Sequence, residues 1–209
     1  MGSGSASPER LILVRHGATA WNAEGRYTTR SDLPLTEEGI AQARAAAAAL
    51  SGERIDRVVC SPLARARLTG EAIAAAQRGG RPDVVVDDRL IEIDAGPFEG
   101  LTMAEIDAGP LAGAHARWRA DTDPVAPEGA EPLTAARDRA AAFFASVREL
   151  PGTTLAATHG SFARVLIASV VLGADPAAHR RMWLSNGHWA TVELGERPRL
   201  VAFNAGPGG

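Results

Sequence analysis

The residues with the clearest chemical potential are Arg15, His16 and Gly17, which directly follow the apolar run of residues 11–14. In α/β sheets, ligands bind where such buried strands end. Gly17 lets the backbone turn tightly and lets a ligand come close. The guanidinium of Arg15 is a permanent cation whose planar set of donors fits a phosphate. The triplet therefore predicts an imidazole that meets an anion.

Three later segments supply groups for the same chemistry. Arg65 lies in the segment of residues 61–66, where a helix opens after a strand and its free amides favour an anion. Glu92 offers a carboxyl group that can exchange protons with an ester oxygen. His159 follows the strand expected at residues 153–158, so it lies at a strand end as His16 does. Each segment alone is weak evidence, and the argument depends on their occurring together.

These segments resemble those of the histidine phosphatase superfamily, also called the phosphoglycerate mutase-like family. The resemblance spans roughly residues 11–194, which is nearly the whole chain. Residues 15–22 resemble the family's leading motif, residues 35–39 its first-helix start and residues 61–69 its second motif. Residues 96–100 resemble its Gly-Asp-Trp-Glu-Gly segment with two substitutions, and residues 159–160 resemble its second histidine motif.

The resemblance implies a covalent mechanism. His16 would attack phosphorus through a neutral imidazole nitrogen, and water would then release phosphate from the phosphohistidine. Arg15 and Arg65 would clamp the phosphoryl oxygens as these gain charge. His159 would donate a hydrogen bond to the phosphoryl group, and Gly160 would permit its close approach.

Glu92 is the proton shuttle that the resemblance implies, giving a proton to the leaving oxygen and then taking one from water. Glu99 is the rival for this role, although we expect it to stabilise its loop instead. The loop after His16 departs from the family pattern at residues 28–30. Further expected contacts are with phosphate at Asn22 and with the rest of the substrate at Thr28, Thr29, Arg26, Trp118 and His188. His115 and His179 are expected at the surface.

Strand-like apolar runs alternate with helix-like stretches, which predicts an α/β fold. The expected architecture is a three-layer α/β/α sandwich around a mostly parallel sheet, with a small cap insertion. Thr36 is the expected N-cap of the first helix, and Pro62 is expected in the first turn of the second. Strands are expected at residues 10–14, 57–60, 84–86, 153–158, 189–194 and 200–203, and helices at 36–50, 62–77, from 131 or 134 to 150, and 161–172.

A chain of 209 residues fits one domain. We expect it to span residues 10–204, with a cap insertion at approximately 101–135 and flexible tails at 1–9 and 205–209. The single cysteine, Cys60, cannot form an internal disulfide. No run is long and apolar enough to span a bilayer, and the first residues do not have the pattern of a signal peptide. The cytoplasm is therefore the expected location.

The expected partner is a small phosphorylated substrate. The net charge of −3 argues against a nucleic-acid-binding domain, and no membrane partner is expected. Because the chain has no His-Glu-x-x-His pattern or similar ligand spacing, we expect no metal and no cofactor. A homodimer stays open, since length and composition do not decide it.

Three functions fit these observations. The first is a metal-independent phosphomonoesterase that acts on a small phosphorylated metabolite of the sugar or glycerate phosphate type. The second is a phosphoglycerate mutase, but mutases of this family generally have a larger insertion than the span between Glu92 and His159 allows. The third is a noncatalytic protein that binds a phosphorylated ligand, which the presence of the whole catalytic set disfavours.

Overall fold

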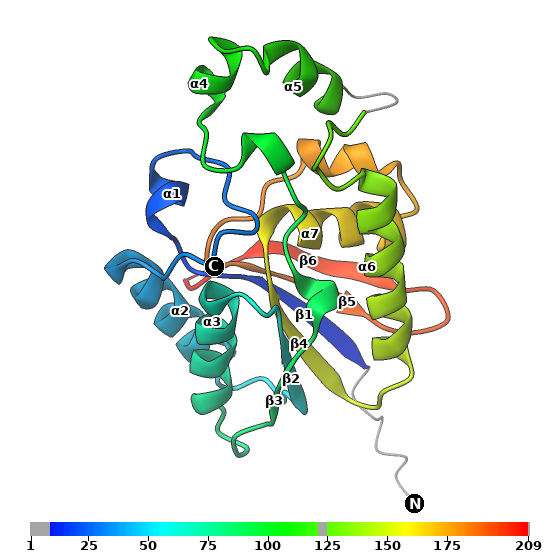
Figure 1. The fold of residues 1–209 in the computed structure, drawn as a ribbon. Coiled ribbons are helices and arrows are strands. Elements are labelled where there is room, and N and C mark those ends of the chain that lie inside the picture. The colour runs from blue at the N-terminus through cyan, green and yellow to red at the C-terminus, as the bar shows by residue number, and fades with distance from the viewer. Residues whose placement is uncertain (1–8, 121–124, 209) are drawn as a thin grey trace, which may run out of the picture.

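One six-stranded sheet forms the centre of the computed structural model, which describes residues 9–120 and 125–208 (Figure 1). The strand order is β3-β2-β4-β1-β5-β6. The first four pair in parallel, and the last two are antiparallel to their neighbours: β1 (Arg10–Arg15), β2 (Arg57–Cys60), β3 (Val84–Val86), β4 (Thr153–Thr158), β5 (Trp189–Glu193) and β6 (Arg199–Ala205). The mostly parallel sheet is confirmed.

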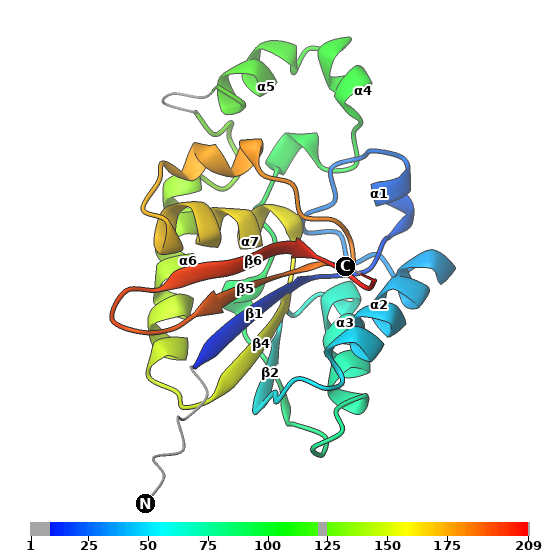
Figure 2. The ribbon, with the colours of Figure 1, turned by 180° about the vertical axis from the view of Figure 1, so that it is seen from behind.

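Helices cover both faces of this sheet (Figures 1 and 2). On one face lie α2 (Glu37–Leu50) and α3 (Ala64–Ala75), and on the other α6 (Leu133–Arg148), α7 (Gly160–Val165) and the π-helix η3 (Leu166–Val171). Along β1, Leu11 and Leu13 pack toward α6 and α7, whereas Ile12 and Val14 pack toward α2 and α3. Because successive side chains of a strand point to opposite faces, a continuously apolar strand requires this double cover. The three-layer sandwich is confirmed.

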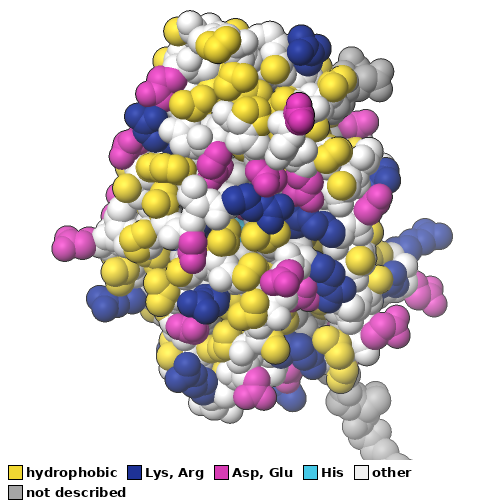
Figure 3. Space-filling model, viewed as in Figure 1, with side chains coloured by type: hydrophobic (Ala, Val, Ile, Leu, Met, Phe, Trp, Pro, Cys, Tyr) yellow, Lys and Arg dark blue, Asp and Glu magenta, His cyan; other side chains and the backbone are white. Residues whose placement is uncertain are grey.

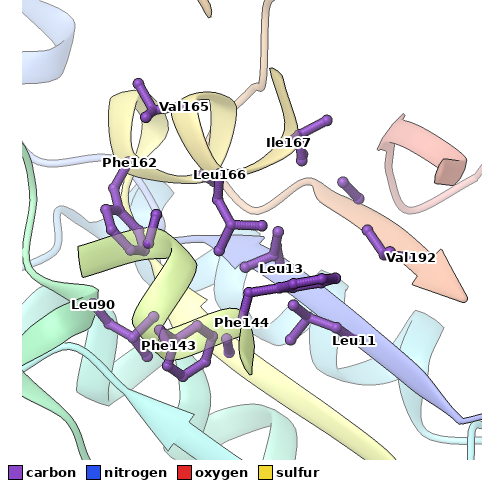
Figure 4. Close-up of a cluster of buried hydrophobic side chains, with 14 of the residues drawn as sticks. Leu11, Leu13, Leu90, Phe143, Phe144, Phe162, Val165, Leu166, Ile167 and Val192 are labelled. Carbon is purple, nitrogen blue, oxygen red and sulfur yellow. The ribbon is translucent and has the colours of Figure 1, made fainter. Parts of the chain in front are cut away.

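The larger hydrophobic core packs helices α6 and α7 against the central strand β1. Phe143 and Phe144 of α6 and Phe162 of α7 pack against Leu11 and Leu13 of β1 (Figure 4). All five side chains are buried. Burying each such large apolar side chain contributes about 1.5–3 kcal/mol. This packing holds the carboxyl ends of β1 and β4 beneath the start of α7.

The second helix begins two residues later than predicted. α3 starts at Ala64, so Pro62 precedes the helix instead of lying in its first turn. The amide of Ala64 donates to Oδ1 of Asp32 at 2.7 Å. A carboxylate from a distant loop thus caps this helix, and a local sequence pattern cannot reveal such a partner.

The stretch of residues 161–172 is not one regular helix. α7 passes into the π-helix η3, and the hydroxyl of Ser169 donates to the carbonyl of Val165 at 2.6 Å. Such back-bonding competes with the regular helical hydrogen bonds.

The described residues near the two chain ends are paired with the sheet. Ala205 of β6 pairs with Trp189 of β5, and the carbonyl of Glu9 accepts from the amide of Leu194. The predicted tail residues 1–8 and 209 lie outside the described residues.

The cap lies over the carboxyl end of the sheet, at the top of Figure 1. Phe98, Ile106 and Trp118 form its small core, against which Tyr27 packs. The cap holds α4 (Met103–Asp107) and α5 (Ala112–Trp118). The remaining short elements of the structure are α1 (Ala20–Ala23), η1 (Asp88–Leu90), η2 (Gly96–Phe98) and η4 (Pro176–Arg181).

No helix among the described residues is long and apolar enough to cross a membrane. On the face drawn in Figure 3, acidic and basic side chains are interspersed.

Helix α2 holds the loop that follows β1. Thr36 is its N-cap, as predicted, and Oγ1 of Thr36 accepts from the amide of Gly39 at 3.0 Å. A Cβ atom added at Gly39 would lie 2.1 Å from the carbonyl oxygen of Ala18. One added at Gly17 would lie 2.1 Å from the carbonyl oxygen of Gly39. The two backbones touch, so glycine is required on both sides.

Replacing Gly39 by alanine is therefore expected to lower the free energy of unfolding by about 1–3 kcal/mol, the usual cost of overpacking. Urea denaturation would measure this change. Gly52→Ala is the matched control, because a Cβ atom there would have nothing within 4 Å. Equal stability of the two variants would contradict the close contact.

Candidate active site

Three parallel strands end at one edge of the sheet and deliver three polar side chains. Arg15 pairs with Thr158, and Cys60 pairs with Ala157. The next residues of these strands are His16, His159 and Ser61. The amide of His16 donates to the carbonyl of Thr158, and the amide of Ser61 donates to that of Ala157, each at 3.0 Å. Strand register thus brings the three side chains together.

His16 is buried with one ring nitrogen left as an acceptor. Its Nδ1 lies 2.6 Å from the carbonyl oxygen of Gly17, which can only accept, so Nδ1 carries the hydrogen. Nε2 then holds a lone pair, and Nε of Arg65 donates to it at 3.3 Å. Burial lowers the pKa of His16 well below its usual value, and the charges of Arg65 and Arg15 act in the same direction. At neutral pH this imidazole is neutral and nucleophilic at Nε2.

His159 lies next to His16, with ring centroids 5.1 Å apart. Its Nε2 lies 2.7 Å from the hydroxyl of Ser61. Its Nδ1 is buried and has no hydrogen-bond partner among the described residues. Burial, followed by the neighbouring His16, lowers the pKa of His159 well below its usual value.

Two arginines complete this cluster, and both are held by neutral oxygens. Arg65 is fully buried, and its terminal nitrogens donate to the carbonyls of Ser31 and Thr29 at 2.7 and 2.8 Å. Arg15 donates to the carbonyl of Leu184 at 2.7 Å, while its Nε is buried and has no partner in the described part of the chain. Burial lowers the pKa of Arg65, and it lowers that of Arg15 to about 10, so Arg15 remains a cation at neutral pH.

These charges leave a place for an anion. Buried charges without a carboxylate partner are costly to the folded protein. A Cβ atom added at Gly160 would lie 3.2 Å from Nε of Arg15, so a side chain at this position would crowd the guanidinium. Nε of Arg15, Nδ1 of His159 and the lone pair of His16 all lack a strong partner within the described structure. A tetrahedral dianion would satisfy the two unpartnered donors and offset both guanidinium charges.

Glu92 reaches this place by capping α7. Its Oε1 accepts from the amides of Ile93 and Phe162 at 2.8 Å, and its Oε2 accepts from the amide of Ser161 at 3.0 Å. The free amides at the start of a helix suit a carboxylate. Glu99 is bound differently, because it accepts from the amides of Thr29 and Ser31. Glu99 thus stabilises its loop, as expected.

Two neighbouring cavities lie beside these residues. A small cavity of about 170 Å³ is lined by Arg15, Asn22, Glu92 and Gly160, among others. A larger cavity of about 350 Å³ lies toward the cap. The two cavities are adjacent, because they share five lining residues, Tyr27, Thr29, Ser161, Arg164 and Trp183.

Of the five predicted substrate contacts, four line the cavities, Arg26 among them. Thr28 lines the small cavity, and Trp118 lines the larger one. Thr29 borders both, but its hydroxyl is hydrogen-bonded to Glu99 and so is not free for a ligand. Asn22 lines the small cavity, and its Oδ1 accepts from Thr19 and from Asn186.

The predicted substrate contacts of Arg26 and His188 stay predictions, and the surroundings of both side chains favour structural roles. Arg26 borders the small cavity, but its guanidinium forms ion pairs with Glu24 and Glu105, each at 2.7 Å. It therefore ties the loop to the cap. His188 lines neither cavity, and its ring lies so close to Gly206 that a Cβ atom there would be 2.2 Å from Nε2.

The prediction that His115 and His179 lie at the surface is wrong. His115 is 2% exposed, and its Nε2 lies 2.9 Å from the hydroxyl of Tyr27. His179 is 6% exposed, and its Nδ1 lies 2.7 Å from the carbonyl of Pro176. Both became buried through contacts with distant segments, which a single sequence does not show.

Sequence reasoning missed the roles of several residues near the cavities. Ser61 was part of a recognised segment, but its bond to His159 was not predicted. Asn186 donates to the carbonyl of His16 at 2.9 Å. Arg164 and Trp183 border both cavities. For Asn186, Arg164 and Trp183, the only feature of the sequence that pointed to the site was their position near His159 or near the Asn-Gly turn.

Burial of His179 makes stability depend on pH, since it lowers the pKa of this imidazole from 6.5 to about 4. As the pH falls, the unfolded chain takes up the proton first, so this contribution to stability is present above pH 6.5 and is lost toward pH 4. Between pH 7 and pH 5 the loss is about 2 kcal/mol. His179→Asn, whose amide keeps a donor toward Pro176, is expected to remove that part of the decline. Urea denaturation at both pH values measures it, and an equal decline in both proteins would contradict the assignment.

Comparisons with known proteins agree with this geometry. The model of the histidine phosphatase superfamily (branch 1) matches residues 11–206. Phosphoserine phosphatase 1 of Hydrogenobacter thermophilus is 31% identical over 194 residues, covering 92% of this chain and 90% of that protein. The protein named probable phosphoglycerate mutase GpmB of Escherichia coli is 35% identical over 194 residues, covering 90% and 86%. The crystal structure of the alpha-ribazole phosphatase from Shigella flexneri has a TM-score of 0.82 at 26% identity, covering 94% and 96%.

Proposed function

The chain belongs to the histidine phosphatase superfamily (branch 1) and is a hydrolase, and on this basis we propose that it is a metal-independent phosphomonoesterase acting through a phosphohistidine on His16. Its substrate is a small phosphorylated metabolite of the sugar or glycerate phosphate type. Relatives named for phosphoserine and phosphoglycerate chemistry support a small substrate.

The observation that carries the proposal is the cluster around His16. His16 lies beside His159, its Nε2 accepts from Nε of Arg65, and the charge of Arg15 acts on it. Nε of Arg15 and Nδ1 of His159 are buried without a hydrogen-bond partner among the described residues. A core histidine needs no such neighbours. A phosphoryl dianion accounts for both guanidinium charges and both free donors at once.

In the first step, Nε2 of His16 attacks phosphorus and the bond to the ester oxygen breaks. Glu92, in its acid form, gives its proton to that oxygen, so the leaving group departs as a neutral alcohol. In the second step, a water molecule gives a proton to the Glu92 carboxylate and attacks phosphorus. The nitrogen–phosphorus bond then breaks, inorganic phosphate leaves, and both residues return to their starting states.

The remaining residues hold the phosphoryl group. Arg15 and Arg65 offset the charge on its equatorial oxygens, and His159 donates from Nδ1 while Ser61 donates to its Nε2. The Oδ1 atom of Asn22 is already bonded within the protein, so its Nδ2 is the atom left to donate to a phosphate oxygen. The larger cavity receives the leaving group.

The test is release of inorganic phosphate from p-nitrophenyl phosphate and from a panel of sugar phosphates and 3-phosphoglycerate. Turnover that EDTA does not diminish is the expected result. Absence of release from every ester, or a requirement for added metal, would contradict the proposal. Conversion of 3-phosphoglycerate to 2-phosphoglycerate faster than phosphate release would indicate a mutase instead.

A further inference from the structure

We propose that Arg164 and Ser161 form a second anion site beside the phosphoryl site, and that the leaving group of the substrate carries a carboxylate that binds there. This inference rests on the proposed phosphatase function and makes it more specific. Neither residue received a role in the mechanism above.

Arg164 is a half-buried cation held only by neutral oxygens. Its Nε donates to the carbonyl of Gly160 at 2.9 Å, and its Nη1 donates to that of Met182 at 2.9 Å. Its Nη2 donates to the hydroxyl of Ser161 at 3.1 Å. No described carboxylate accepts a hydrogen bond from it, whereas Arg139, for comparison, pairs with Glu131 at 2.6 Å. Arg164 thus shares the environment of the arginines in the phosphoryl site.

Two donors remain for a ligand at this position. The second hydrogen of Nη1 points to the carbonyl of His179 at 3.4 Å, which leaves one hydrogen on Nη2. The hydroxyl of Ser161 accepts from Arg164, and its own hydrogen is bonded to no described residue. Adjacent guanidinium and hydroxyl hydrogens match the two oxygens of one carboxylate.

The location joins this site to the phosphoryl site. Ser161 and Arg164 line both cavities. Gly160 is near both guanidiniums, because its carbonyl accepts from Arg164 and a Cβ atom added to it would lie 3.2 Å from Nε of Arg15. A single small ester can therefore reach both cations.

Glu92 favours a singly charged group at this site. Its carboxylate accepts from the amide of Ser161 at 3.0 Å, and its charge acts on Arg164. A carboxylate on the leaving group adds one negative charge beside Arg164, whereas a second phosphate dianion would meet stronger repulsion from Glu92.

The first experiment compares wild-type kcat/KM on two matched pairs. These are 3-phosphoglycerate with glycerol 3-phosphate, and O-phosphoserine with phosphoethanolamine. Each pair differs in the carboxylate, and we expect at least about a tenfold preference for the carboxylated ester. Equal values in both pairs would overturn the inference. Failure to hydrolyse any of these esters or p-nitrophenyl phosphate would instead contradict the proposed function.

The second experiment assigns the preference to these residues. Ser161→Ala is expected to lower the ratio within each pair at least about threefold, and Arg164→Gln is expected to bring it close to one. Arg148→Gln is the matched control, because this exposed arginine donates only to the carbonyl of Gly195. Melting temperatures report folding. If Arg164→Gln does not fold, the result for Ser161→Ala decides. The assignment is refuted if the folded variants of Arg164 and Ser161 keep the wild-type ratio, as the control should.

Discussion

Replacing His16 by alanine is expected to abolish phosphate release, lowering kcat by about 10⁴-fold or more. The variant loses the nitrogen that bonds to phosphorus. A water molecule in the place of Nε2 would have no base beside it to take its proton, so direct attack by water cannot replace the nucleophile. Steady-state phosphate release would measure the loss. Rapid quenching of the wild-type enzyme with labelled substrate should trap an acid-labile phosphoryl group on the protein, and the variant should trap none.

The control for this experiment is His188→Ala. His188 also follows a turn near the site, but it lines neither cavity. It should therefore keep turnover and labelling close to wild type. An active and labelled His16→Ala enzyme would refute a phosphohistidine formed on His16.

Replacing Glu92 by glutamine is expected to lower kcat on alkyl phosphates by about 10²–10⁴-fold, the usual contribution of a general acid or base. An alkoxide is a poor leaving group without a proton, and an amide cannot supply one. p-Nitrophenolate leaves readily as an anion, so the first step on p-nitrophenyl phosphate should survive. Hydrolysis of the phosphohistidine should still be slow, because the base that activates water is missing.

Stopped-flow measurement would separate these steps. With p-nitrophenyl phosphate, Glu92→Gln should give a burst of p-nitrophenol close to the enzyme concentration, followed by slow turnover. With an alkyl ester it should give no burst. Glu92 also caps α7 through three amides, so a purely structural role predicts equal losses in the first step for both esters. That outcome would contradict the proton shuttle.

Residues at strand ends were predictable from sequence. His16 and His159 each come directly after a predicted strand, and the register of β1 and β4 places them side by side. The sheet, both covering layers and the N-cap at Thr36 follow from local periodicity and side-chain type as well. Such features depend on neighbours a few residues away, and these neighbours are visible in a single chain.

Pairing and burial were not predictable in the same way. Arg26 and Arg164 are both arginines close to a recognised segment, yet Arg26 is neutralised by Glu105 while Arg164 has only neutral acceptors among the described residues. Glu105, the partner of Arg26, lies 79 residues away from it in sequence. Likewise, the burial of His179 depends on how η4 packs against α7 and the cavity.

The sequence by itself determined which groups can react with a phosphoryl anion and that strands deliver them to one edge. Only the tertiary structure decided which cations remain without a carboxylate and which imidazoles are shielded from water. The physical reason is that charge compensation and desolvation arise from contacts between segments far apart in the chain, whereas residue type and strand period are local properties.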